Sequence, residues 1–174
     1  VRWRYEGIAL HSRDVRGLNG EPSPGWILER PKCIYNPSTG LYVLWAHLDG
    51  PAVRPALPTL PTWSNYQLGA AAVAVSRTPV GPFTFVHAVR PPGGMRSFDA
   101  SLFLDARRGV AYRIQDVEHQ SIGFYELDGA FTNFSGKAPV AVLNERREAV
   151  APFYWDGRYY LATSGVSGWA PTAS

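Results

Sequence analysis

Three segments of the sequence share one plan, and this repetition constrains the fold more than any other feature. Each has an acidic residue, an apolar run, a turn that ends in glycine, and a second apolar run. The acid precedes the glycine by 11, 10 and 9 residues in the pairs Glu29 and Gly40, Asp99 and Gly109, and Glu148 and Gly157. Aromatic runs joined by Asp156–Gly157 favour a tight β-hairpin, because that turn needs positive φ at both central residues. We therefore predict three related hairpins.

The rest of the chain also reads as strands and turns, without sustained helical periodicity. Further apolar runs follow the first two hairpins, at residues 70–89 and 120–136, and a Pro-rich stretch at 49–63 reads as an inserted loop. A β unit of about 50 residues that recurs with its own hairpin is typical of a β-propeller blade. The prediction is an all-β chain.

Repetition also gives the three acids a shared position. In a propeller, the first strand of each blade runs beside the central axis, so acids at the start of three successive first strands would converge on one pocket. The competing interpretation is that Glu29, Asp99 and Glu148 are solvated strand-end residues. Because the acids recur at similar spacing, we favour the shared pocket.

Composition excludes several classes of protein. With 174 residues, 45% hydrophobic and 18% charged, the chain suits one globular domain. The net charge is +3, but the arginines are scattered, so no nucleic-acid partner is predicted. The longest apolar run, at residues 68–75, is far below the roughly 20 residues of a membrane span. Cys33 is the only cysteine, which excludes an intrachain disulfide, and its apolar surroundings predict a buried thiol.

Four ordered blocks resemble a known family. They read "ERPKCIYNPSTGLYVLWAH", "AVSRTPVGPF", "RPPGGMRSFDASLFLD" and "EAVAPFYWDGRYYLATSGVSGWAP". Together they resemble glycoside hydrolase family 43, in particular its exo-β-1,3-galactanases. The resemblance implies a five-bladed β-propeller, of which residues 1–174 would hold roughly the first half. The chain would then be a partial catalytic domain of about two to three blades, truncated at both ends.

The resemblance also assigns roles to individual residues. Members of this family invert the anomeric centre, which requires a carboxylic acid on one side of the sugar and a base on the other. Glu148 matches the general acid, and Asp99 matches the residue that orients this acid and raises its pKa. The matches for substrate binding are Glu29, Tyr66 and Trp169, although Trp169 could instead be a core or interface residue.

The sequence departs from the family pattern at two places near these residues. Phe98 stands where an arginine is usual, and the proline after Glu148 is shifted to Pro152. The base has no match, since the resemblance puts it, or the amide that replaces it, outside the chain. Three spare acids, Asp116, Glu118 and Glu145, are not assigned as the base. The fragment alone is therefore expected to be inactive.

The main functional prediction is an inverting hydrolase that releases galactose from β-1,3-galactan of arabinogalactan. Three alternatives are another family 43 activity (arabinofuranosidase or xylosidase), a non-catalytic galactan-binding propeller, and a structural propeller. The resemblance further implies an oligosaccharide or polysaccharide substrate, no metal or cofactor, and a monomer when full length. It also implies an extracellular or periplasmic location, with no signal peptide visible in this chain.

Overall fold

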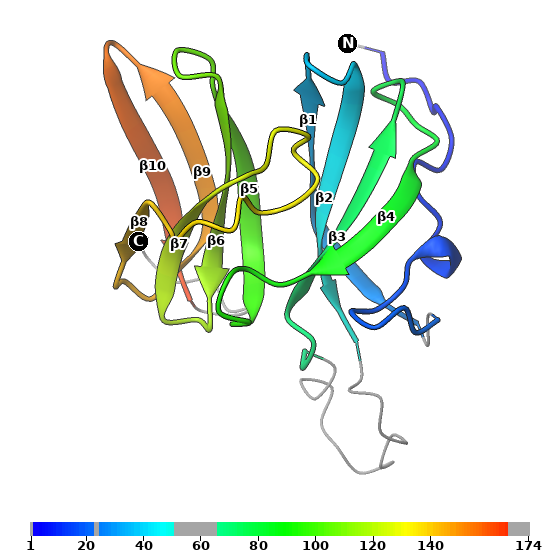
Figure 1. The fold of residues 1–174 in the computed structure, drawn as a ribbon, viewed down its shortest axis with the longest axis horizontal. Coiled ribbons are helices and arrows are strands. Elements are labelled where there is room, and N and C mark those ends of the chain that lie inside the picture. Colours follow the sequence, from blue (N-terminus) through cyan, green and yellow to red (C-terminus); the bar gives the residue numbers. More distant parts are fainter. Residues whose placement is uncertain (1, 23–24, 51–65, 167–174) are drawn as a thin grey trace.

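A computed structural model of the chain describes residues 2–22, 25–50 and 66–166. The described residues form two four-stranded antiparallel sheets and one two-stranded hairpin, which lie side by side (Figure 1). The helical content of these ranges is a single 3-10 turn, η1 (Ser12–Asp14). The all-β prediction is therefore confirmed. No helix in the described ranges has the length and apolar character needed to cross a membrane.

Each sheet follows the chain in order. The strands are β1 (Ile27–Asn36), β2 (Leu41–Asp49), β3 (Ala70–Ser76) and β4 (Thr84–Val89) in the first sheet, β5 (Ser97–Asp105), β6 (Val110–Val117), β7 (Ser121–Glu126) and β8 (Ala141–Leu143) in the second, and β9 (Arg147–Trp155) and β10 (Arg158–Gly165) in the hairpin. Consecutive strands pair throughout, and this meander is the strand order of a propeller blade.

The three predicted hairpins are confirmed as β1–β2, β5–β6 and β9–β10. The apolar run at 70–89 forms β3 and β4, whereas the run at 120–136 supplies only β7 and an isolated bridge between Leu127 and Phe134. The fourth strand of the second sheet comes later, as β8. The Pro-rich stretch predicted at 49–63 begins inside β2, which ends at Asp49, and its residues 51–63 lie outside the described residues.

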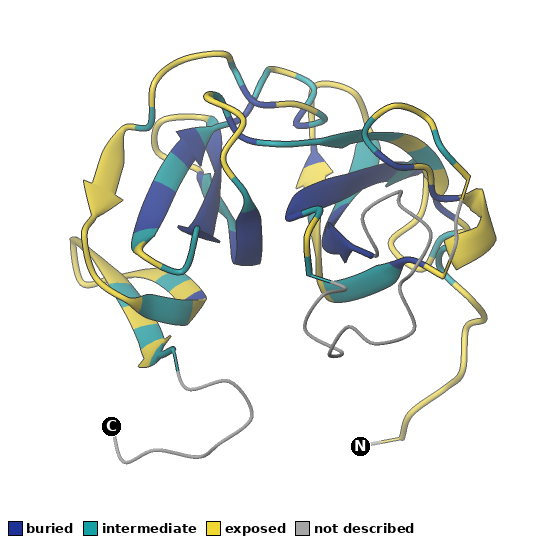
Figure 2. Cartoon of the chain, turned by 90° about the horizontal axis from the view of Figure 1, so that it is seen from below, coloured by how far each residue is buried: buried dark blue, intermediate teal, exposed yellow. Residues whose placement is uncertain are grey.

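The first strand of each sheet lies next to the first strand of its neighbour. Strand β5 contacts β1 on one side and β9 on the other (Figure 1). The largest core fills the space between the first two sheets, where Trp45 is 1% exposed. Its indole Nε1 donates to the carbonyl of Phe131 at 2.8 Å, and its ring meets Phe134 edge-on. Figure 2 shows the buried residues in these two sheets, while the hairpin is largely exposed.

A β-bulge interrupts the first strand of each hairpin beside its acid. The register of β1 shifts between Glu29 and Lys32, and that of β9 shifts where Ala162 and Ser164 face it. The residue after the acid has positive φ in both strands, 51° at Arg30 and 53° at Ala149. Glu29 and Glu148 are therefore structurally equivalent. A bulge bends the strand and re-aims side chains, so both glutamates are placed by the same device.

Asp99 has a different position from the one predicted. The bulge in β5 lies between Ser97 and Ala100, so Asp99 is inside the bulge, whereas each glutamate immediately precedes its bulge. The three acids lie near the same end of three adjacent strands, but only two of them are in strict register.

The prediction for Cys33 is wrong, because this thiol is exposed. Cys33 and Tyr35 lie on one face of β1, and Tyr35 is exposed as well. Among the described residues, strand β1 is the first of its sheet and pairs only with β2.

Candidate functional site

Glu29 on β1 has two polar neighbours, His47 of β2 and Tyr66, which forms an isolated bridge with Gly50. Its Oε1 accepts a hydrogen bond from the hydroxyl of Tyr66 at 2.8 Å, and its Oε2 lies 3.4 Å from Nδ1 of His47. His47 faces Glu29 directly across the β1–β2 pair. The sequence predicted both Glu29 and Tyr66 as sugar-binding residues, and the structure brings them into contact.

Behind Glu29 lies a buried polar network. Nε2 of His47 is 3.0 Å from Oδ2 of Asp49, and both side chains are at most 2% exposed. Asp49 also accepts hydrogen bonds from the amides of Gly50, Leu68 and Gly69, at 3.0, 2.7 and 3.1 Å. These bonds hold the backbone at Leu68 and Gly69 against the end of β2, and so fix the chain just after Tyr66.

The environment of Tyr66 favours its neutral, hydrogen-bond-donating form. Burial, the hydrogen bond to Glu29 and the negative charges of Glu29, Asp49 and Asp99 raise the pKa of Tyr66 to about 12. A neutral hydroxyl donates to the carboxylate throughout the physiological pH range. The Tyr66 hydroxyl therefore holds Oε1 of Glu29, while Oε2 of Glu29 lies near Nδ1 of His47.

Asp99 is tied to the first sheet by an ion pair. Nε of Arg30, the residue of positive φ after Glu29, donates to Oδ1 of Asp99 at 2.9 Å. Oδ2 of Asp99 is buried and has no hydrogen-bond partner among the described residues. The bulge in β1 thus sets Arg30, the residue after Glu29, against Asp99. The shared pocket of the three acids stays a prediction.

A line of rings runs from the first sheet to the second. His47 meets Phe98 edge-on with 5.6 Å between ring centroids, and Phe98 stacks on His119 at 3.9 Å. Tyr66 lies 6.0 Å from His47 at the other end of this line. Phe98, at 5% exposure, fills the space at the start of β5 where the family resemblance led us to expect arginine.

His119 lies on the turn between β6 and β7, and the sequence did not single it out. Asp116 accepts hydrogen bonds from the backbone amide of His119 at 2.9 Å and from its Nδ1 at 2.6 Å. The hydrogen bond that Nδ1 donates to Asp116 raises the pKa of His119 against a lowering by burial, and the charges of Asp116 and Glu148 raise it further. Glu148 therefore lies close enough for its charge to act on this ring.

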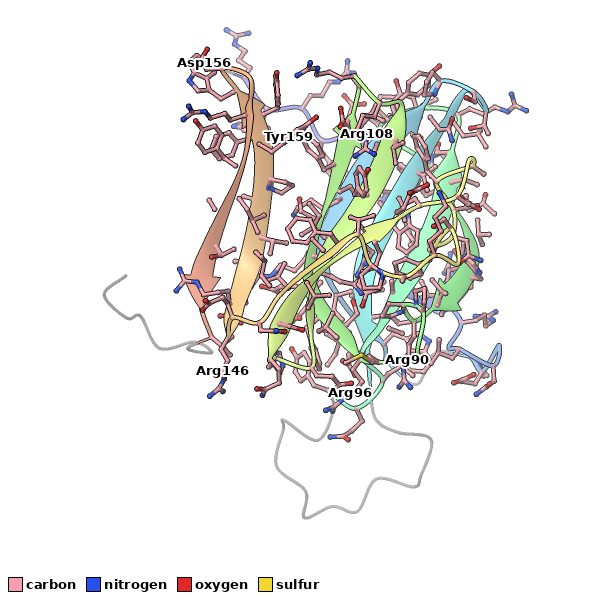
Figure 3. The ribbon with its side chains drawn as sticks, turned by 60° about the vertical axis from the view of Figure 1, so that its left-hand side comes forward. Arg90, Arg96, Arg108, Arg146, Asp156 and Tyr159 are labelled. Atoms are coloured by element: carbon pink, nitrogen blue, oxygen red, sulfur yellow. The ribbon has the colours of Figure 1, made fainter. Side chains whose placement is uncertain are left out.

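Glu148 itself is partly buried on β9, opposite Ser164 of β10. Figure 3 shows Arg146, two residues before it, at the same end of the sheets as Arg96, which immediately precedes β5. Asp156 and Tyr159 lie at the opposite end of the hairpin. The structure thus places Glu148 at the end occupied by Asp99. Trp169 lies outside the described residues.

Two of the spare acids also have structural partners. Asp116 holds His119, and Glu118 accepts from the backbone amide, Nε and Nη2 of Arg96. Although burial opposes it, the hydrogen bonds and charge of Arg96 lower the pKa of Glu118. A fixed ion-paired carboxylate is a poor proton acceptor, so neither acid is assigned as a base. The described residues hold no group of three or more His, Cys, Asp or Glu arranged to bind a metal ion.

Comparison with known proteins gives matches among solved structures only. No protein-family model and no curated protein matches the sequence. An exo-β-1,3-galactanase from Phanerochaete chrysosporium, solved with β-1,3-galactotriose, superposes with a TM-score of 0.75 at 31% identity. An exo-β-1,3-galactanase from Clostridium thermocellum gives 0.70 at 33% identity, and a family 43 β-1,3-galactosidase solved with galactodeoxynojirimycin gives 0.76 at 29%.

These matches cover most of this chain but only part of each relative. In the same order, they span 94%, 84% and 97% of this chain, and 34%, 31% and 58% of the solved proteins. The chain thus corresponds to between about a third and three fifths of their length. The resemblance predicted from the four sequence blocks is confirmed.

Proposed function

We propose that this chain, which resembles glycoside hydrolase family 43 over nearly all of its length, is part of an inverting exo-β-1,3-galactanase. The two four-stranded meanders and the hairpin would be the first blades of a five-bladed β-propeller. The observation that carries the proposal is the equivalence of Glu29 and Glu148, each placed by the same bulge at the same end of its strand.

The proposed roles follow from the surroundings of each acid. Glu148 would protonate the oxygen of the leaving sugar, since it is the partly buried acid on β9, the first strand of the third hairpin. Asp99, tied to Arg30, would orient Glu148 and contribute negative charge that keeps it protonated. Glu29, held by Tyr66, would bind sugar hydroxyl groups, which carboxylate oxygens accept strongly.

The base belongs to the part of the mechanism that this chain does not supply. An inverting reaction needs a group that activates water on the face of the sugar opposite the acid. Because Asp116 and Glu118 are engaged with His119 and Arg96 and no other described acid is assigned as the base, we propose that it comes from the remainder of the propeller. The full protein would act on an extracellular or periplasmic galactan as a monomer.

One experiment tests the assignment of the acid. In the full-length protein, Glu148→Gln should lower the rate of galactose release from β-1,3-galactotriose by about 10²- to 10⁴-fold, the usual contribution of a general acid. Glu145→Gln is the matched control, because Glu145 is an exposed glutamate three residues away. Equal activity of the Glu148→Gln variant and the wild type would refute the assignment. Proton NMR of the first product should show the anomer opposite to the β-linkage.

A non-catalytic galactan-binding propeller is the second candidate. Phe98 favours it, because this ring fills a place where the family resemblance led us to expect a charged side chain. Binding of galactotriose to the wild-type full-length protein by calorimetry, without release of galactose, would support this candidate over the hydrolase.

A further inference from the structure

The turn between β6 and β7 is strained and strongly held. Glu118 and His119 both have positive φ, at 55° and 54°, and neither is glycine. Consecutive left-handed residues with side chains cost free energy, and such strain persists only where the surroundings enforce it. Here Arg96 enforces it, because its amide and guanidinium bind the Glu118 carboxylate and its carbonyl accepts from the Glu118 amide at 3.2 Å.

The strained turn fixes the ring of His119 on two sides. Nδ1 is 2.6 Å from the carboxylate of Asp116, which is fully buried, and one ring face lies on Phe98 at an interplanar angle of 14°. The side chain is nevertheless 44% exposed. A ring held at Nδ1 and on one face presents Nε2 as its remaining polar atom.

Charges around the ring determine what Nε2 can do. Asp116 of β6 favours the protonated ring, as does Glu148 of β9 while it is ionised, and Arg96, before β5, opposes it. The net effect raises the pKa of His119, so the imidazolium persists to higher pH than in an isolated histidine. In that form both ring nitrogens donate, and because Nδ1 is engaged with Asp116, Nε2–H is the donor that remains for a ligand.

We propose that His119 is a sugar-positioning residue whose Nε2–H donates a hydrogen bond to an oxygen of the galactosyl unit bound beside Glu148. The inference rests on the proposed function, and it adds to the predicted site a residue that binds only when protonated. A neutral ring with Nδ1–H on Asp116 has an acceptor at Nε2, so the same sugar oxygen would lose its donor. Substrate binding should therefore weaken as pH rises through the titration of His119.

Two variants of the full-length protein test this. His119→Asn removes the ring while keeping a residue type that tolerates positive φ, so the turn is preserved. Asp116→Asn keeps the shape of the partner and removes its charge. We expect His119→Asn to raise KM for β-1,3-galactotriose by about 10-fold or more at pH 5, as for loss of a charged hydrogen bond, with a smaller change in kcat. His11→Ala, at an exposed histidine before η1, is the control.

The pH profile separates positioning from a structural role. In the wild type, KM should rise with pH through the His119 transition; in Asp116→Asn the rise should begin at lower pH, because the pKa of His119 falls. In His119→Asn this rise should be absent, while the melting temperature stays close to that of the wild type. If KM of His119→Asn depends on pH in the same way as KM of the wild type, the inference is wrong.

A binding measurement distinguishes this inference from the proposed function. Side-chain ¹⁵N NMR of the Glu148→Gln protein should show the Nε2 signal of His119 shifting on addition of galactotriose. If the wild type releases galactose but this signal does not respond, the role of His119 is wrong and the hydrolase remains. If the wild type neither binds nor cleaves galactotriose, the proposed function fails, and the role of His119 fails with it.

Discussion

Replacing Asp49 should disorganise the approach to the candidate site, although no sugar contact is predicted for this residue. Its side chain is 0% exposed and accepts four hydrogen bonds, three from the backbone amides of Gly50, Leu68 and Gly69 and one from His47. All four donors are directed at one carboxylate. We choose Asp49→Asn, which preserves the shape and changes the number of acceptors.

The magnitude follows from counting donors and acceptors. An asparagine has one carbonyl oxygen with two lone pairs, so it satisfies at most two of the four donors, and its NH₂ group faces the other two. An unsatisfied buried polar group costs about 1–3 kcal/mol, which gives a total of about 2–6 kcal/mol. Even the lower limit is a large share of the usual 5–15 kcal/mol of a folded domain.

Hydrogen exchange of the full-length protein measures this locally. A peptide that contains Leu68 and Gly69 should exchange at least about 30-fold faster in Asp49→Asn, because 1.4 kcal/mol corresponds to a factor of ten. The control is Asp14→Asn, which removes the same charge from an exposed position in η1. Unchanged exchange at Leu68 and Gly69 in Asp49→Asn would show that these bonds do not hold the segment.

Two further predictions concern the scaffold of the full-length protein. Gly69→Ala should lower stability by about 2–5 kcal/mol, since φ is +49° and the new Cβ would lie 2.4 Å from Cβ of Arg96, whereas Gly40→Ala, with φ of +68° and open space, should cost about 1 kcal/mol. Equal melting temperatures for these two variants would contradict this. Tyr159→Phe removes the hydrogen bond that, against burial and with backbone amides, lowers the pKa of Asp105 from 3.8. A carboxyl group whose pKa is lowered on folding stabilises the folded state at pH values above its unfolded pKa of 3.8. At pH 6 the wild type should therefore have the higher melting temperature, and the difference from Tyr159→Phe should disappear as the pH falls below 3.8.

The sequence predicts the hairpins well because their signals are local. In the third hairpin, Asp156 and Gly157 both have positive φ, at 44° and 80°, as the Asp-Gly signal requires. The alternation of apolar residues then sets the strands on each side. The fourth strand of the second sheet is harder to predict, because Ala141–Leu143 is short, exposed and formed by pairing with β7 rather than by its own pattern.

The site is less predictable because its contacts join residues far apart in the sequence. Arg30 meets Asp99, which is 69 residues away, and Tyr66 meets Glu29 across 37 residues. The bulges that aim the glutamates have no turn signal, since Arg30 and Ala149 are ordinary residues with positive φ. His47 and Asp49 could have been suspected from "WAHLDG", where two polar residues alternate at the end of an apolar strand.

The placement of the acids also explains why the sheets must stay in register with one another. Like charges brought together destabilise each other unless donors compensate them. Here the compensating groups come from both sheets, since Asp99 of the second sheet is held by Arg30 of the first, while Phe98 contacts both His47 of the first and His119 of the second. A small shift of one sheet would therefore separate Asp99 from its cation and move His119 relative to Glu148. The site thus depends on the packing between sheets, and changes in the Trp45 core should affect sugar binding as well as stability.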